Sequence, residues 1–171
     1  MPTAEHRSPE TMDVRTLIAH IAAGYQQVHR KVLPELVELA RKVERVHHDV
    51  PDAPIGLADA LERIALALDL HMQEEENVLF EAMRQDIGSV MAHPIAVMRA
   101  EHQAYTAELD AIAEIAHGFA VPDGACGSWR RLYAGVADLD AALREQIRLE
   151  DKVLFPRFDV QAQTRCICAH A

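Results

Sequence analysis

The sequence predicts an all-α protein, a four-helix bundle with up-down-up-down topology. Ala, Leu, Glu and Arg dominate the long segments and runs of β-branched residues are absent, which favours helices over strands. Glycine and proline gather in short clusters that mark turns between these segments. Half of the 171 residues are hydrophobic, which is enough for one core and does not require a second domain.

The first helix is expected to run from about Val14 toward His47, with Asp13 as its N-cap. Pro34 lies inside this range. Proline removes a backbone hydrogen bond and clashes with the preceding turn, so we expect the helix to kink or restart near Leu33 and Pro34.

Three further helices follow. A turn at 51–56 leads into the second helix, over residues 57–84. The third spans about 93–117, because the proline of His93-Pro94 suits a first helical turn. Ser128 is expected to cap the fourth, which runs to about 155. Short connections between four long helices make neighbours antiparallel, so helices two and four should lie parallel and diagonally opposed.

Two segments 75 residues apart carry the same pattern: HMQEEENVLF at 71–80 and QIRLEDKVLF at 146–155. Each places a candidate ligand four residues before a glutamate, His71 before Glu75 and Gln146 before Glu150. This spacing puts both members of a pair on one helix face. Apolar residues continue the face, with Leu68 before the first pair and Val78 and Leu79 after it, so these polar groups are expected to be buried.

The third helix presents another candidate ligand to the core. His102 lies on an apolar stripe formed by Ile95, Met98, Tyr105, Leu109 and Ile112. An unpaired buried carboxylate is strongly destabilising and normally binds a cation. We therefore predict a buried metal site with approximate twofold symmetry, where bridging carboxylates and terminal histidines hold two ions.

Together these motifs resemble the hemerythrin-like (HHE cation-binding) family, and specifically its bacterial di-iron proteins that repair iron centres after nitrosative or oxidative stress. The resemblance covers about residues 14–158. It rests on strings that occur in order: LPEL at 33–36, KVERVH at 42–47, HMQEE at 71–75 continuing to Phe80, VMRAEH at 97–102 and EDKVLFPR at 150–157.

The resemblance implies a non-haem di-iron centre with Glu75 and Glu150 as bridging ligands and His71 and His102 as terminal ligands. Gln26 and Gln146 stand where the family has further terminal histidines, and the two losses could affect different ions. Glutamine binds metals weakly through its carbonyl oxygen. The site could therefore be mononuclear, weak, empty as purified, or selective for another divalent metal.

Two more histidines fall within the resemblance. His47 matches a histidine of the repair proteins, but it follows Gln26 by 21 residues, about 31 Å along an unbroken helix. Metal ligation and a capping role at the bundle end both stay open for His47. His29 lies three residues after Gln26 and is a candidate to support the ligands.

Three functions compete. The leading hypothesis is a binding protein rather than an enzyme, whose iron centre binds NO, O2 or iron and serves iron–sulfur centre repair during nitrosative or oxidative stress. The second is a di-metal peroxidase or NO-reducing enzyme. The third is a metal-poor bundle that acts in protein interaction. The metal, the physiological ligand and the oligomeric state, including a homodimer, stay open.

The charge and the hydropathy of the sequence exclude some classes of protein. The formal net charge of -10 argues against nonspecific nucleic-acid binding. No apolar run approaches the roughly 20 residues of a membrane span and no secretory pattern occurs, so we expect a soluble cytoplasmic protein. The expected layout is a disordered lead at 1–11, the bundle at 12–158 and a tail at 159–171. That tail contains Cys166, Cys168 and His170, to which we assign no role.

Overall fold

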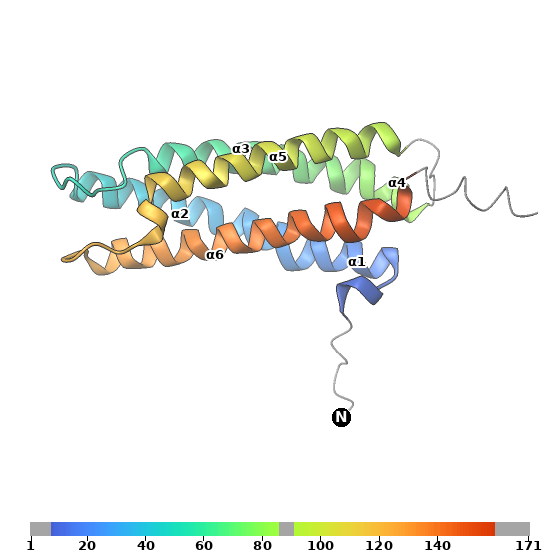
Figure 1. Cartoon of the computed structure of the whole chain (residues 1–171), viewed down its shortest axis with the longest axis horizontal. Coiled ribbons are helices and arrows are strands. Elements are labelled where there is room, and N and C mark those ends of the chain that lie inside the picture. Colours follow the sequence, from blue (N-terminus) through green and yellow to red (C-terminus); the bar gives the residue numbers. More distant parts are fainter. Residues whose placement is uncertain (1–7, 86–90, 160–171) are drawn as a thin grey trace, which may run out of the picture.

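The computed structural model describes residues 8–85 and 91–159, which form four helical rods (Figure 1). No strand occurs in these two ranges. The rods are α1 (Val14–Ile21), η2 (Ala22–Gln26) and α2 (Gln27–Val46); α3 (Leu57–Glu74), η3 (Glu75–Leu79) and α4 (Phe80–Arg84); α5 (Ala92–Ile115); and α6 (Gly127–Leu149), η6 (Glu150–Leu154) and η7 (Phe155–Phe158). Two short 3-10 turns, η1 (Pro9–Thr11) and η5 (His117–Phe119), complete the described elements.

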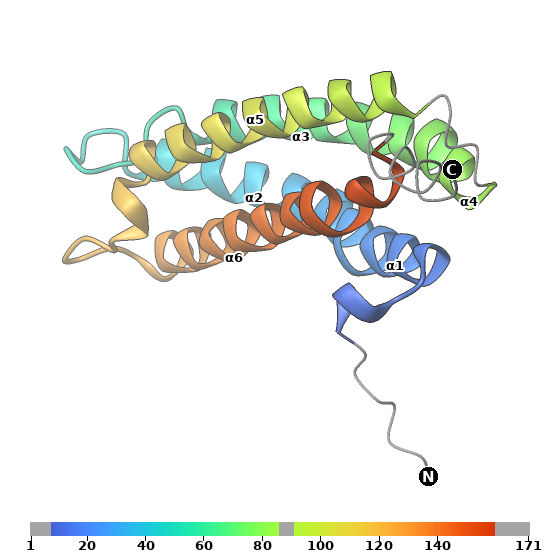
Figure 2. The same ribbon diagram turned by 45° about the vertical axis from the view of Figure 1, so that its right-hand side comes forward.

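The rods are arranged as the sequence predicts. α2 packs against α3 and α6, and α5 packs against the same two helices. α3 and α6 therefore lie diagonally across the bundle, and the rods run side by side along its length (Figure 2). The all-α, up-down-up-down prediction is confirmed.

The helix ends confirm one predicted cap and correct another. Asp13 caps α1, because its Oδ1 accepts a hydrogen bond from the Thr16 backbone N–H at 3.0 Å. Ser128 does not cap α6. That helix already begins at Gly127, with Cys126 at the N-cap and no side-chain capping bond.

α2 continues through Pro34, so the predicted restart of the helix at that residue is wrong. Buried Leu33, Leu36 and Val37 anchor the flanking turns in the core, and this packing holds the helix together despite the lost hydrogen bond. The irregularity in the first rod lies upstream, at the π-helical segment η2.

Two other π-helical segments, η3 and η6, begin at Glu75 and Glu150 in the two copies of the repeat. A π turn holds more residues than an α turn and changes which side chains face inward. For that reason only one of the two residues that we placed on the buried face after Glu75 lies there: Leu79 is buried, whereas Val78 is 58% exposed. Single π turns inside α-helices occur frequently at functional sites.

The interior has two apolar clusters separated by a polar layer. One cluster surrounds Leu61 and Trp129, and the other surrounds Ile18 and Phe80. On every rod, buried polar residues lie between members of the two clusters. These residues are Gln26, His29, His71, Glu75, His102, Gln146 and Glu150.

Both ends of the predicted layout fall partly outside the described residues. Residues 1–7 and 160–171 are not described, so the tail cysteines lie outside the described residues. Within the expected disordered lead, residues 9–11 form the turn η1. Among the described residues, no helix is long and apolar enough to cross a membrane.

Candidate metal centre

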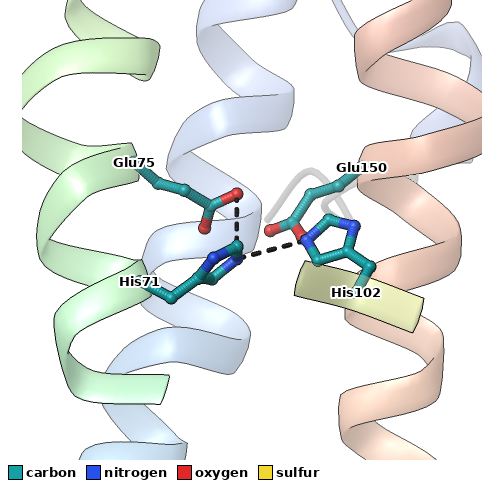
Figure 3. A group of neighbouring side chains, drawn as sticks. All are labelled: His71, Glu75, His102 and Glu150. Atoms are coloured by element: carbon teal, nitrogen blue, oxygen red, sulfur yellow. Dashed lines mark hydrogen bonds and ion pairs between the residues drawn. The ribbon is translucent and has the colours of Figure 1, made fainter. Parts of the chain in front are cut away.

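Four of the seven candidate ligands meet in the polar layer. His71 lies in the last turn of α3 and Glu75 begins η3, while His102 comes from α5 and Glu150 from η6. One ligand atom of each residue lies within 4.8 Å of those of the other three. Figure 3 shows the two imidazoles and the two carboxylates turned toward one another.

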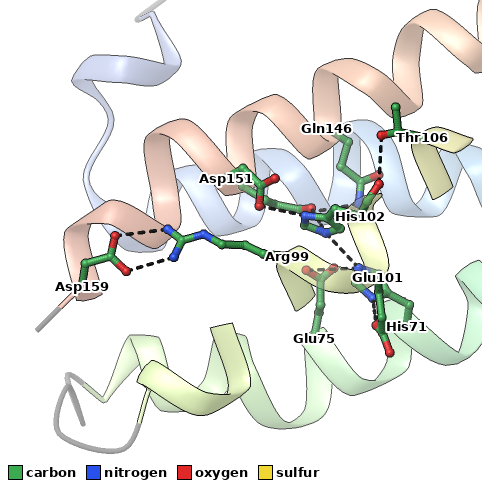
Figure 4. Close-up of polar contacts among 10 residues, drawn as sticks. His71, Glu75, Arg99, Glu101, His102, Thr106, Gln146, Asp151 and Asp159 are labelled. Atoms are coloured by element: carbon green, nitrogen blue, oxygen red, sulfur yellow. Dashed lines mark hydrogen bonds and ion pairs between the residues drawn. The ribbon is translucent and has the colours of Figure 1, made fainter. Parts of the chain in front are cut away.

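The histidine rings face each other through their Nε2 atoms, which are 3.2 Å apart. Each Nδ1 contacts a carboxylate. Glu101 Oε2 lies 2.6 Å from His71 Nδ1, and Asp151 Oδ1 lies 2.9 Å from His102 Nδ1 (Figure 4). A carboxylate on Nδ1 holds the proton there and leaves the Nε2 lone pair for a metal ion, as in carboxylate–histidine–metal triads.

Neighbouring rings fix the two imidazole planes. The ring of Tyr105 packs edge-on against His71 at 5.1 Å between centroids. Phe155 stacks on His102 at 5.8 Å with only 7° between the planes. The side chains of His71 and His102 are 2% exposed, so the faces of the site are apolar and its ligand atoms are shielded from water.

Both carboxylates are fully buried, and one oxygen of each accepts no hydrogen bond. These are Glu75 Oε1, 3.5 Å from His71 Nε2, and Glu150 Oε2, 3.2 Å from His102 Nε2. Buried carboxylate oxygens without a donor are expensive unless a cation satisfies them. Two imidazole nitrogens and two unsatisfied carboxylate oxygens around one volume fit a divalent metal ion.

Charge and burial act on the pKa values of these groups. Burial and the charge of Glu150 raise the pKa of Glu75 well above its ordinary value. Burial would lower the pKa of His102, but its contacts with Asp151 and Glu150 raise it to about 10. Burial lowers the pKa of His71 despite its hydrogen bond with Glu101. The cluster thus strongly favours added positive charge, which a proton or a metal ion can supply.

The two glutamines lie on the opposite side of the carboxylates from the histidines. Gln26 Nε2 donates to Glu75 Oε2 at 2.7 Å, and Gln146 Nε2 donates to Glu150 Oε1 at 3.0 Å. Because η2 packs against α6, whereas α3 packs against α5, both replacements fall on one side of the centre. The sequence had left open that the two replacements affect different ions, whereas here Gln26 and Gln146 lie on the same side of the carboxylates.

The two remaining histidines occupy different places. His29 is buried on the glutamine side, close to Gln146, and its Nε2 has no hydrogen-bond partner. His47 lies at the C-cap of α2, outside the ligand cluster, where Nε2 contacts Cys126 Sγ at 3.2 Å. Its ring centroid is 5.0 Å from that of Trp129. The structure therefore does not bring His47 to the metal centre.

Sequence reasoning missed Glu101 and Asp151. Each is adjacent in sequence to a candidate ligand, Glu101 before His102 and Asp151 after Glu150, and this adjacency was the available signal. The contact itself could not be derived from spacing, since Glu101 on α5 reaches His71 on the neighbouring helix α3.

The fold and the cluster define a class, the helical bundles whose inner faces carry carboxylates and histidines for metal ions. Comparison with known families makes this specific: the model of the hemerythrin HHE cation-binding domain matches residues 18–158. This chain therefore belongs to the hemerythrin HHE cation-binding domain family.

Curated relatives share the match. An iron-sulfur cluster repair protein YtfE from Pectobacterium carotovorum subsp. carotovorum is 44% identical over 141 residues, which cover 82% of this chain and 64% of that protein. The protein of the same name from Yersinia pseudotuberculosis is 42% identical over 159 residues, covering 92% and 72% respectively. The chain thus spans less than two thirds of the Pectobacterium relative.

Proposed function

We propose that this chain binds iron through His71, Glu75, His102 and Glu150 and serves the repair of iron centres during nitrosative or oxidative stress. One observation carries the proposal: four buried ligand atoms lie within 4.8 Å of one another, and two of them are imidazole nitrogens aimed inward by outer carboxylates. Groups this costly to bury converge where a cation would satisfy them.

The donor set narrows the choice of metal. Imidazole nitrogen with carboxylate oxygen suits first-row transition metals such as iron, manganese and zinc better than calcium or magnesium. Membership of a cation-binding family and the repair role in the relatives' names favour iron among these. When bound by four protein ligands, iron can offer further coordination positions to a small molecule such as NO or O2.

The protein residues have separable tasks in this proposal. His71, His102, Glu75 and Glu150 hold the ion, and the two carboxylates balance its charge. Glu101 and Asp151 keep the Nδ1 protons in place, as outer carboxylates do at metal-bound histidines. Apolar side chains above and below the polar layer exclude water, which strengthens the electrostatic attraction between ion and ligands.

The metal-binding part is tested by anaerobic reconstitution with Fe(II), removal of loose metal, and elemental analysis. Glu75→Ala should abolish retained iron, because it removes a buried ligand. Glu74→Ala is the matched control, since Glu74 is the adjacent but exposed residue on α3. A parent protein that retains no iron, or a Glu75→Ala variant that retains as much as the parent, would refute the assignment.

The repair part requires its own assay. An enzyme containing an iron–sulfur cluster is inactivated with NO, and its recovery is measured with the iron-loaded protein, with the iron-loaded Glu74→Ala control and with free Fe(II) at the same concentration. Faster recovery with the parent and with the control variant than with free iron is expected. Equal recovery with free iron would leave metal binding intact and remove the repair role.

A further inference from the structure

The two oxygens of each central carboxylate face different sides. Glu75 turns Oε1 toward His71 and Oε2 toward Gln26, and Glu150 turns Oε2 toward His102 and Oε1 toward Gln146. On the histidine side the oxygens accept no hydrogen bond, whereas on the glutamine side each accepts an amide N–H. The carboxylates are thus positioned to bridge two sites, but only one of these lacks a protein donor.

We propose that this centre holds one metal ion, on the histidine side, and that the amide groups of Gln26 and Gln146 replace a second ion. The inference rests on the proposed function and fixes the number and position of the ions. An amide N–H carries partial positive charge and binds a carboxylate oxygen at hydrogen-bond distance. Two such donors can therefore satisfy the oxygens that a second cation would otherwise bind.

The distribution of charge favours the same side. One divalent ion balances the two central carboxylates, and the histidine side has two further carboxylates, those of Glu101 and Asp151. Among the described residues, no further carboxylate is hydrogen-bonded to Gln26, Gln146 or His29. A second divalent ion there would add two positive charges that no additional protein anion offsets.

His29 provides the strongest argument for the opposite view and is therefore part of the test. Its side chain lies on the glutamine side, close to Gln146, and its Nε2 is buried without a hydrogen-bond partner. It does not belong to the group of four converging ligand atoms. A second ion would have to combine this imidazole with amide oxygens, which bind first-row metals weakly, and turning the amides would break both hydrogen bonds to the carboxylates.

The experiment counts ions and reads their magnetic coupling. The parent protein is loaded anaerobically with excess Fe(II) or Mn(II), desalted and analysed for metal, and its EPR spectrum is recorded after oxidation for iron or directly for manganese. We expect about one ion per chain and the spectrum of an isolated high-spin ion. Two ions bridged by carboxylates would instead couple magnetically and suppress that spectrum.

Three variants sharpen the result. Gln26→His combined with Gln146→His should raise the count to about two ions per chain and suppress the isolated-ion spectrum, because it supplies two terminal nitrogens. Gln73→His with Gln103→His is the matched control at exposed positions and should leave the count at one. His29→Ala should also leave the count at one.

The outcomes separate the two proposals. If the parent retains two ions with a coupled spectrum, or if His29→Ala lowers its count, the one-ion inference is overturned while the iron-binding function stands. If the parent retains none, the proposed function fails and the inference fails with it. One retained ion that Glu75→Ala removes and His29→Ala does not supports both.

Discussion

Glu75 and Glu150 create a conflict between metal binding and stability, and the substitution Glu75→Gln exposes it. Two fully buried carboxylates lie in one cluster, and burial together with the charge of Glu150 raises the pKa of Glu75. The native pKa therefore exceeds that of the unfolded chain. Above the unfolded pKa the unfolded state releases the proton more readily, so metal-free stability falls as pH rises toward the native pKa.

Glutamine has nearly the same shape as glutamate and no charge, so the metal-free variant should escape this loss. We expect metal-free Glu75→Gln to be more stable than the metal-free parent at pH 8 by about 1–3 kcal/mol, the range for one buried polar group. For a domain of this size that corresponds to a melting temperature about 2–12 °C higher. The Gln26 hydrogen bond survives, because the new carbonyl oxygen can accept it.

Bound metal should reverse this order of stability, so that the parent becomes more stable than Glu75→Gln. A ligand at about 100 times its Kd stabilises the native state by about 2.7 kcal/mol, or about 5–11 °C in melting temperature here. The parent should gain this amount, and the variant, which lacks one carboxylate ligand, should gain much less. Thermal unfolding followed by circular dichroism, with chelator and with Mn(II), measures both effects.

Measurements at pH 5 and pH 8 test the cause. The stability difference between the metal-free proteins should be smaller at pH 5, where the unfolded state releases the Glu75 proton less completely. Glu74→Gln, at the adjacent exposed position, should change neither stability nor metal response. A metal-free Glu75→Gln protein that is less stable than the parent at pH 8 would refute the argument from buried like charges.

Three further predictions follow from individual contacts. Asp151→Ala should weaken metal binding by about 10- to 100-fold, measured by competition with a chelating dye, because it removes the carboxylate that orients a ligand imidazole. His47→Ala should raise the pH midpoint of Cys126 alkylation, because contact with His47 lowers the pKa of the Cys126 thiol. For this measurement the two tail cysteines are first replaced by serine. An unchanged midpoint would argue against the contact between His47 and Cys126. Metal-free protein with Gln26→His and Gln146→His should unfold in urea within about 1.5 kcal/mol of the parent, whereas a larger loss means that the cavity does not accept the imidazoles.

Helical periodicity was sufficient for the rods and for which face of each rod carries buried ligand-type side chains. The stripe that contains Met98, His102 and Tyr105 is buried throughout, because α5 is a regular helix whose inward face follows directly from residue spacing. The same logic placed His71 and Glu75 together. These features depend on one helix at a time, and for that reason a single sequence reveals them.

Features that depend on two helices together could not be obtained this way. The π turns at Glu75 and Glu150 add a residue to a turn, which local propensity does not encode and which packing around the centre must stabilise. The contact between Glu101 and His71 depends on the rotation of α5 against α3. The pairing of His47 with Cys126 joins residues 79 positions apart at the bundle end.

The arrangement of Gln146 and Glu150 is what the proposed one-ion centre requires. Gln146 and Glu150 lie on the same rod, yet Gln146 faces the glutamine side while Glu150 turns Oε2 toward His102 across the centre. A change at position 146 therefore alters one side only, whereas loss of Glu150 would remove a ligand from the histidine side. A second ion could be replaced by amide donors without damage to the first, provided that both carboxylates stayed, and this is the pattern that the chain carries.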